Sequence, residues 1–162
     1  MFQLKQIKPA ILASLIVIGF AFHSKPAEAA GTEVLTVAGG CFWCVESDFE
    51  RVPGVKEVVS GYTGGKKKNP TYKDVTKGGS GHYEAVQIQF DPAKLFLDQL
   101  LNMFFRSVNP MDAGGQLCDR SNSYCTVVFG SNNAQNASAK AAKQVAQNVL
   151  GQKIVTPISQ DG

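Results

Sequence analysis

The sequence predicts one domain of the α+β class, a two-layer α/β sandwich of ferredoxin-like type with large loop content. Strand-like and helical segments are mixed along the chain, without the regular alternation that produces a parallel, doubly wound sheet. The 162 residues are 44% hydrophobic and 18% charged, which supplies one core and excludes disordered, collagen-like and coiled-coil chains. No internal repeat and no shift in composition indicates a second domain.

The N-terminal half is predicted to run strand, helix, strand and loop. A short apolar strand over 34–37 precedes a helix over 42–51, and Pro53-Gly54 closes that helix. The β-branched residues of 55–59 predict a second strand. The glycine-rich residues 61–81 predict a long loop.

The C-terminal half is predicted to contain three further strands and two helices. The clearest strand covers 85–90, where apolar residues alternate with glutamines. A helix over 91–106 carries leucines and phenylalanines at helical spacing, which gives it a stripe that faces the core. The remaining predicted segments are a loop over 109–123, a strand over 124–129, an alanine-rich helix over 134–150 and a last strand over 154–158.

The first residues have the layout of a secretory signal peptide. Lys5 and Lys8 precede an almost wholly apolar run over 10–22, and Ala27-Glu28-Ala29 provides a small-x-small cleavage site. We expect residues 1–29 to be the signal peptide and 30–162 the mature domain, exported to the periplasm. The apolar run is shorter than the roughly 20 residues of a membrane span, so no membrane attachment is expected after cleavage. An uncleaved N-terminal anchor is the alternative.

The charge balance argues against a nucleic-acid partner. The chain has 16 Lys and Arg against 13 Asp and Glu, and removing the leader's three lysines and one glutamate leaves 13 against 12. A net charge this near zero provides no basic footprint for a phosphate backbone. We expect no nucleic-acid partner and a monomeric protein.

The stretch Gly39-Gly40-Cys41-Phe42-Trp43-Cys44 is the most informative in the chain. Cys41 is expected where a strand ends and a helix begins, and free N–H groups at a helix start stabilise the nucleophilic thiolate. Phe42 and Trp43 beside it indicate a pocket for an uncharged, methyl-sized group. Packing of both rings into the core is the alternative.

The spacing of Cys41 and Cys44 permits a disulfide across the first helical turn. The same spacing is half of a zinc site, but Cys118 and Cys125 are separated by six intervening residues rather than two to four. His82 is the only histidine outside the leader, so we expect no metal. A purely structural disulfide framework is less favoured, because a chain of this length can bury a core without cross-links.

Glu84 is the candidate acid. It begins the alternating strand and shares a face with Val86 and Ile88, where an acidic side chain must be paired or have a raised pKa. A carboxyl with a raised pKa is suited to donate a proton near neutral pH. A surface position at a fraying strand end is the alternative.

These residues together resemble the type A family of peptide methionine sulfoxide reductases. The resemblance covers residues 33–158 in the family's order, and its first motif is highly specific whereas the others are strong only jointly. The motifs are Gly40-Cys41-Phe42-Trp43, Asn69-Pro70-Thr71-Tyr72, Gly81-His82-Tyr83-Glu84, and Asp119 with Tyr124.

The resemblance implies an oxidoreductase of protein repair under oxidative stress, a peptide-methionine (S)-S-oxide reductase. Its substrates would be the S epimer of methionine sulfoxide, free or in oxidised proteins. Cys41 would attack the sulfoxide sulfur, and Glu84 would protonate the sulfoxide oxygen. Tyr72 and Tyr124 would hydrogen-bond that oxygen, with Asp119 in the polar network that orients them.

The resemblance further implies that Phe42 and Trp43 hold the substrate's methyl group. Cys41 would remain as a sulfenic acid, which a second cysteine converts to a disulfide. An external thioredoxin-like dithiol would reduce that disulfide, with no bound cofactor. Family members commonly carry the resolving cysteine in a C-terminal segment, which we expect to be short or truncated here. We therefore rank Cys44, then Cys118, then Cys125 as the resolving residue.

The chain departs from the family pattern in three places. These are Val108-Asn109-Pro110 for the usual His-Asp-Pro, Gly114-Gly115-Gln116-Leu117 for Asn-Arg-Gln-Gly, and Cys125 for an arginine. We expect these differences to affect substrate affinity more than the chemistry, because the named catalytic positions are retained.

Three other functions remain open. An exported thiol–disulfide oxidoreductase using Cys41 and Cys44 would exchange with protein disulfides and would not need Glu84. A disulfide-stapled binding module would contain no free thiol when oxidised. Neither alternative accounts for Tyr72 and Tyr124 alongside that glutamate. A truncated, inactive homologue is the third.

Overall fold

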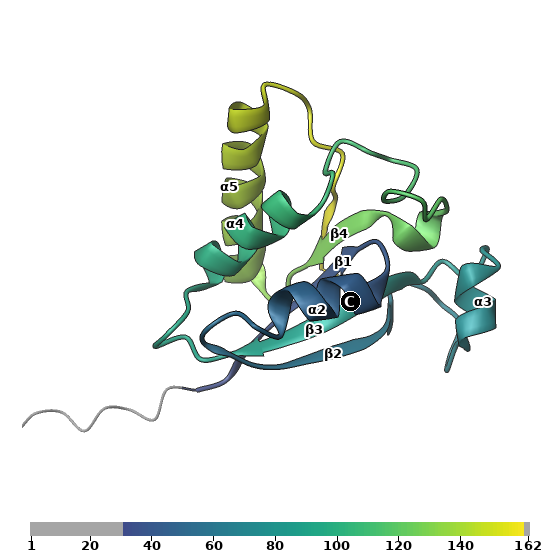
Figure 1. The fold of residues 1–162 in the computed structure, drawn as a ribbon, viewed down its shortest axis with the longest axis horizontal. Coiled ribbons are helices and arrows are strands. Elements are labelled where there is room, and N and C mark those ends of the chain that lie inside the picture. Colours follow the sequence, from purple (N-terminus) through teal and green to yellow (C-terminus); the bar gives the residue numbers. More distant parts are fainter. Residues whose placement is uncertain (1–30, 161–162) are drawn as a thin grey trace, which may run out of the picture. The chain divides into compact units, whose positions relative to one another are not determined.

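The computed structural model describes residues 31–160, so the predicted signal peptide over 1–29 lies outside the described residues. The described chain contains one mixed sheet and the helices that pack on it (Figure 1). No helix in this part of the chain is both long and apolar enough to cross a membrane. The elements run in the order β1 (Glu33–Gly39), α2 (Phe42–Phe49), β2 (Val55–Thr63), α3 (Tyr72–Thr76), β3 (Tyr83–Phe90), α4 (Leu97–Ser107), the 3-10 turn η1 (Asn122–Tyr124), β4 (Thr126–Phe129), α5 (Asn133–Leu150) and β5 (Ile158–Ser159).

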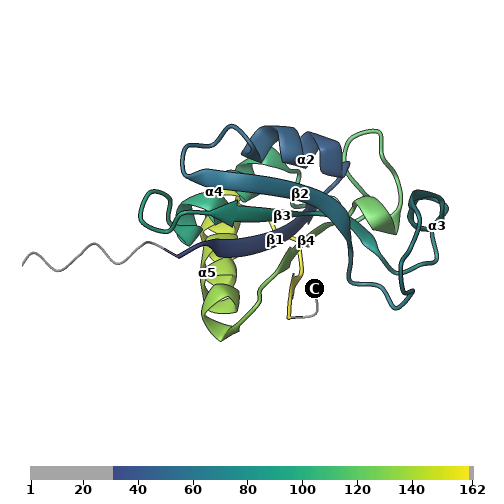
Figure 2. The same cartoon turned by 90° about the horizontal axis from the view of Figure 1, so that it is seen from below.

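The sheet has five strands in the order β2-β3-β1-β4-β5. Every neighbouring pair is antiparallel except β4 with β5, which is parallel. Figure 2 shows β2, β3, β1 and β4 side by side across the sheet, with α4 and α5 behind it. The predicted α+β class is confirmed, whereas the ferredoxin-like detail stays a prediction.

One face of the sheet forms the main core with α2, α4 and α5. The register places Leu35 of β1 opposite Ile88 of β3, and both side chains are buried in the same core cluster as Phe104 of α4. The apolar stripe predicted for the helix over 91–106, which is α4, therefore faces the core. Burial of each large apolar side chain there stabilises the fold by about 1.5–3 kcal/mol. The other face holds a smaller cluster of Ala38, Ala85, Val127 and Phe129.

The predicted helix over 91–106 begins later than the sequence indicated. Residues 91–95 form a turn in which Leu95 N–H donates to Asp91 O across 2.9 Å. Helix α4 starts only after Phe96, whose N–H donates to Gln99 Oε1 across 2.9 Å. The Asp91 side chain accepts from Ala93 N–H, so this aspartate closes the turn instead of starting the helix.

Two predicted strands and one predicted loop also differ from the structure. The segment 124–129 begins as the 3-10 turn η1, and the strand over 154–158 is reduced to Ile158–Ser159. The loop over 61–81 is wrong in part, because it contains the end of β2 and the helix α3. Helix α3 forms because Thr71 and Asp74 cap it reciprocally.

Candidate functional site

Cys41 lies at the junction of β1 and α2, as the sequence predicts. It is the N-terminal cap of α2, and its carbonyl accepts from Cys44 N–H and Val45 N–H at 3.1 and 3.2 Å. Gly40 before it has φ +99°, and a Cβ at that position would lie 2.8 Å from Gln116 Cβ. Only glycine fits this turn, so Gly40 positions Cys41 at the start of the helix.

A cavity of about 190 Å³ opens at Cys41, and Cys44 lines it as well. The pKa of the Cys44 thiol is raised, first by burial and then by the charge of Cys41 and a hydrogen bond with it, with smaller effects from Asp119 and Asp48. The two thiols are therefore close neighbours across the first turn of α2. Asp119 lines the same cavity, and its negative charge acts on the Cys44 thiol.

Glu84 is buried, with 1% of its surface exposed, as the alternation of β3 predicts. Its Oε2 accepts the Phe42 backbone N–H across 3.1 Å, and its Oε1 has no hydrogen-bond partner in the described part of the chain. Burial raises the pKa of Glu84, and the Asp119 carboxylate raises it further. The Phe42 hydrogen bond and the nearby Tyr124 hydroxyl oppose that pKa shift without reversing it. The carboxyl is thus held towards its neutral, proton-donating form.

Three aromatic rings lie around the ring of Phe42. Its ring centroid lies 5.3 Å from Trp43, 5.6 Å from Tyr62 and 6.5 Å from Tyr72. The Trp43 and Tyr72 rings stack, with an interplanar angle of 17°. Phe42 is buried and also packs in the main core, whereas Trp43 is 64% exposed. The cluster is therefore an apolar, solvent-accessible surface beside Cys41.

Tyr62 of this aromatic cluster was not predicted. It lies directly across from Glu84 in the β2–β3 register, and burial followed by the Glu84 charge raises the pKa of its hydroxyl. The sequence signal that could have found it is the continuation of the second strand beyond Val59. Three more residues of extended chain bring Tyr62 into register with the candidate acid.

Tyr72 and Tyr124 come from different parts of the chain and meet near Glu84. Tyr72 is the first residue of α3, and Tyr124 is the last residue of η1. The Ser123 hydroxyl joins these two elements by donating to the buried Val75 carbonyl across 2.8 Å. Burial raises the pKa of Tyr124 most, followed by the charge of Glu84 and by the charge and hydrogen bond of Tyr72. The two hydroxyls and the carboxyl thus form one polar group.

A short hairpin presents Asp119 to the site. The backbones of Gln116 and Asp119 pair through two hydrogen bonds of 3.0 and 2.9 Å. The buried Gln116 amide holds this hairpin to the segment after α4: it accepts from Asn109 N–H at 2.7 Å and donates to Asn109 O at 2.9 Å and Gly115 O at 2.8 Å. Gln116 was not singled out from sequence, because nothing in its neighbours indicates burial.

The predicted nucleophile, acid, tyrosines and aromatic residues are thus brought together around the start of α2, whereas Cys118 does not line the cavity there. Comparison with known proteins gives the family. The profile described as "Peptide methionine sulfoxide reductase" matches residues 33–161. The chain belongs to this family. The predicted resemblance is confirmed.

Two relatives of the peptide methionine sulfoxide reductase family illustrate the match. The chain is 50% identical over 133 residues to peptide methionine sulfoxide reductase MsrA 2 of Rhizobium meliloti, which covers 82% of this chain and 66% of the relative. It is 45% identical over 128 residues to MsrA of Bacillus subtilis, covering 78% of this chain and 72% of that protein. The chain therefore spans about two thirds of the length of the Rhizobium relative.

Solved structures of the same family share the fold. Methionine sulfoxide reductase A of Corynebacterium diphtheriae matches with a TM-score of 0.72 at 25% identity, covering 84% of this chain and 66% of that chain. Reduced Mxr1 of Saccharomyces cerevisiae matches with a TM-score of 0.77 at 26% identity, covering 88% of this chain and 82% of that chain. Both matches support the α+β assignment.

The two other cysteines of this family member do not line the cavity at Cys41, although Leu117 and Asp119 on either side of Cys118 do. Cys118 is exposed on the hairpin that carries Asp119, but it does not line that cavity. Cys125 lines a separate cavity of about 530 Å³, where its thiol donates to Ala113 O across 3.2 Å. Burial and the Asp112 charge raise the pKa of Cys125, and Arg120 opposes them.

All four cysteines are free thiols in the structure. Within the described residues, no three His, Cys, Asp or Glu side chains are grouped so that they could hold a metal ion. His82 of the third motif has a structural position: it accepts from Gly65 N–H at 3.3 Å and donates from Nε2 to Lys67 O at 2.8 Å. These contacts close the loop that precedes α3.

Proposed function

We propose that the chain reduces the S epimer of methionine sulfoxide, free or in oxidised proteins, to methionine. One observation carries the proposal: a buried carboxyl, Glu84, is hydrogen-bonded to the backbone beside Cys41 and has one oxygen without a partner in the described chain. Reduction of a sulfoxide requires a thiol that attacks sulfur and an acid that protonates the departing oxygen. Membership of the reductase family supports the same reaction.

In the first step, the Cys41 thiolate attacks the sulfoxide sulfur while Glu84 gives a proton to the oxygen. The attack forms a bond between the two sulfur atoms, and the protonated oxygen is a hydroxyl on the substrate sulfur. That hydroxyl then passes to the Cys41 sulfur as the substrate's sulfur–oxygen bond and the new sulfur–sulfur bond break, so methionine leaves and Cys41 becomes a sulfenic acid. Electrons pass from the thiolate to the substrate, so the substrate is reduced and the cysteine oxidised. Tyr72 and Tyr124 supply hydroxyl donors to the oxygen, and Asp119 favours the protonated form of Glu84 through its charge.

The aromatic cluster around Phe42 selects the substrate. Phe42 and Trp43, with Tyr62 and Tyr72 beside them, offer an apolar surface against which the methyl group of methionine sulfoxide packs. Such rings contribute through burial of apolar area and do not require the substrate to carry a charge. The S–CH₃ group of methionine meets that requirement, and aromatic faces also bind sulfur favourably.

Cys44 is the residue we propose to resolve the sulfenic acid. Its thiol is the neighbour of Cys41 in the same cavity, whereas Cys118 and Cys125 do not line that cavity. Cys44 attacks the Cys41 sulfur, a disulfide forms, and the oxygen leaves as water. Two thiols of an external thioredoxin-like protein then reduce the disulfide. Mxr1 of Saccharomyces cerevisiae in complex with Trx2, a structure of similar fold with a TM-score of 0.57 and 20% identity, supports that class of partner.

The rival, a thiol–disulfide oxidoreductase using Cys41 and Cys44, is not favoured. It leaves the buried Glu84 and the converging Tyr72 and Tyr124 hydroxyls without a role. The family match favours the reductase instead. We further propose that the mature protein acts as a monomer outside the cytoplasm, after removal of residues 1–29. Cell fractionation with N-terminal sequencing of the secreted chain tests this location, and an intact residue 1 would support the membrane-anchor alternative.

The experiment for the activity measures methionine released from each epimer of N-acetylmethionine sulfoxide, with dithiothreitol as reductant. The wild type is expected to consume the S epimer only. Cys41→Ser should abolish turnover with the fold intact by circular dichroism, and Cys118→Ser is the matched control that should turn over normally. Turnover by Cys41→Ser near the wild-type rate would contradict the assignment of the nucleophile.

A further inference from the structure

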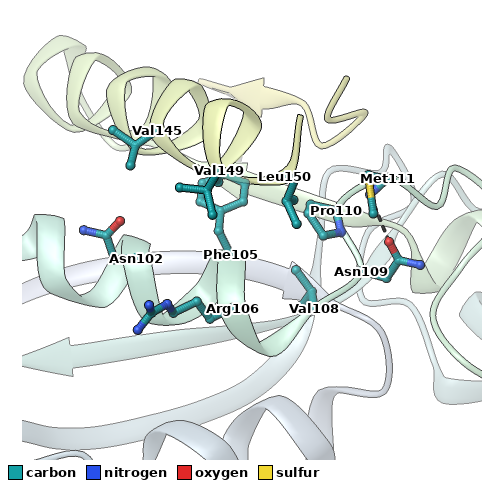
Figure 3. Close-up of a pocket in the computed structure, with 11 residues that line it drawn as sticks. Asn102, Phe105, Arg106, Val108, Asn109, Pro110, Met111, Val145, Val149 and Leu150 are labelled. Atoms are coloured by element: carbon teal, nitrogen blue, oxygen red, sulfur yellow. Dashed lines mark hydrogen bonds between the residues drawn. The ribbon is translucent and has the colours of Figure 1, made fainter. Parts of the chain in front are cut away.

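A second, larger cavity lies between α4 and α5 and has no part in the reaction described so far. Its volume is about 750 Å³, within the range of sites that bind extended organic ligands. Figure 3 shows Val145, Val149 and Leu150 of α5 on one side, with Phe105 of α4 between them and the chain that leaves α4. We call this cavity the α4–α5 groove.

The α5 wall of the groove exposes more apolar surface than a solvent-facing helix needs. Val149 is 81% exposed, Val145 is 53% exposed and Leu150 is 40% exposed. Val145 and Val149 are four residues apart, so they lie one above the other on the same face of α5. A contiguous apolar surface of this kind is typical of an interaction site.

The groove also has a charge preference. Arg106 is the only charged residue among those that line it, and it forms no ion pair with any other described residue. Asn102 and Asn109 are the other polar side chains of the lining, and neither can neutralise a guanidinium. A carboxylate is the group that complements this cation, through paired hydrogen bonds.

The α4–α5 groove and the Cys41 cavity share one wall. Val108 and Asn109 line both of them, and Gln116 fixes the Asn109 backbone by two hydrogen bonds. An extended polypeptide whose oxidised methionine lies at Cys41 therefore has only this short segment to cross before it reaches the groove.

We infer that the α4–α5 groove binds the polypeptide that flanks the oxidised methionine, and that it selects apolar residues together with one carboxylate. The inference rests on the proposed reductase function and gives it a preferred class of protein substrate. Apolar side chains of the peptide lie against Val145 and Val149, and an acidic residue pairs with Arg106. Free methionine sulfoxide is too small to use the groove.

The test uses the full chain, dithiothreitol and two peptides that carry methionine-S-sulfoxide beside leucines. One peptide has a single glutamate, and the other has a lysine in its place. Each peptide is made in one version that extends on the N-terminal side of the sulfoxide and in another that extends on the C-terminal side. Compared with the wild type, Arg106→Glu should lower kcat/KM for the glutamate peptide by about tenfold and should raise kcat/KM for the lysine peptide. Val149→Asp should lower kcat/KM for both peptides, and the control Ala141→Asp, on an exposed position of α5 outside the groove, should not.

N-Acetylmethionine sulfoxide separates this inference from the function on which it rests. Arg106 and Val149 do not line the Cys41 cavity, so both variants should reduce this small substrate at the wild-type rate. Fluorescence anisotropy measures the affinity of the Cys41→Ser variant for each peptide. Because this variant does not turn over, its affinity reports peptide binding in the groove independently of catalysis. Peptide binding that depends on Arg106, without reduction of the small substrate, would support the groove and reject the proposed function. Peptide kinetics and affinity that are unchanged by Arg106→Glu and Val149→Asp would overturn the proposed role of the groove.

Discussion

The backbone N–H of Phe42 donates to Oε2 of the buried Glu84 across 3.1 Å, and this bond joins the start of α2 to strand β3. Phe42 follows Cys41 directly, so the same bond fixes the carboxyl beside the candidate nucleophile. The bond favours the ionised carboxylate, yet burial and the Asp119 charge outweigh it and raise the pKa of Glu84. The hydrogen bond thus fixes the position of the carboxyl, while burial and the Asp119 charge favour its protonated, neutral form.

Replacement of Glu84 by glutamine is expected to remove the pH dependence of the first step. In the wild type, the protonated fraction of Glu84 falls as pH rises through its raised pKa, so the rate of methionine release should fall on the alkaline side. Glu84→Gln should slow release by about 100-fold near neutral pH, the usual contribution of a general acid. Single-turnover rates across pH check this, and a variant that keeps the wild-type pH profile would place the proton donor elsewhere.

The same substitution should change how stability depends on pH. Because the pKa of Glu84 is raised above its ordinary value of 4.5, the folded state binds more protons than the unfolded state between those two values. The free energy of unfolding therefore falls as pH rises through that interval. Glu84→Gln lacks this loss, so its Tm relative to the wild type should increase from pH 4 to pH 8. Tm curves for the two proteins that run parallel across this pH range would show that burial does not oppose ionisation of Glu84.

Leu117 is expected to strain the hairpin that carries Asp119. It has φ +50°, a conformation that costs a side chain with a Cβ about 1–2 kcal/mol, and it is 92% exposed, so packing does not offset the cost. Leu117→Gly should increase the free energy of unfolding by about 1 kcal/mol in urea titration. Leu117→Ala is the control, because it removes the side chain but keeps the Cβ, and it should not stabilise the protein. Equal effects of the two changes would mean that φ is not the cause.

Gln116 is expected to be important for both stability and activity. Gln116→Ala removes three hydrogen bonds and leaves the Asn109 and Gly115 groups without this partner, which should cost about 2–3 kcal/mol. Because the lost contacts hold the hairpin, kcat should fall together with Tm. Gln116→Glu keeps the acceptor for Asn109 N–H and should be less destabilised. A destabilised Gln116→Ala variant with normal kcat would show that the hairpin positions nothing in the site.

Ser123→Ala tests how Tyr72 and Tyr124 are kept together. The Ser123 hydroxyl donates to Val75 O at 2.8 Å and joins η1 to α3, and its loss should cost about 1 kcal/mol. The separation of the two tyrosines would then vary, so KM for methionine sulfoxide should rise more than kcat falls. Ser123→Cys, which retains a weak donor, should be intermediate in Tm. A KM that stays unchanged would show that η1 and α3 are positioned independently of this bond.

Local patterns were sufficient for the elements that bury one clear face. The alternation of 85–90 predicted β3, and the spacing of Leu100, Leu101 and Phe104 predicted the buried face of α4. Patterns failed where side chains cap the backbone: Asp91 closes a turn before α4, and the Thr71–Asp74 pair starts α3 within a predicted loop. Both outcomes depend on local side-chain hydrogen bonds that apolar periodicity does not report.

The candidate site was predicted in its residues more than in its geometry. The turn before Cys41 and the buried face of Glu84 followed from glycines and alternation. Tyr62 and Gln116 were missed, because their roles come from strand register and from a loop that closes over distant residues. Contacts between residues far apart in sequence require the folded sheet and cannot be read from local composition.

The most direct measurement of the central claim counts thiols and methionine in a single turnover. The fully reduced protein is mixed with methionine-S-sulfoxide without any external reductant, and the products are quenched and quantified. The account predicts one methionine per chain with two thiols lost, a Cys41–Cys44 disulfide by mass spectrometry, and only one thiol lost in Cys44→Ser. No methionine from either epimer, or a disulfide that excludes Cys41, would contradict it.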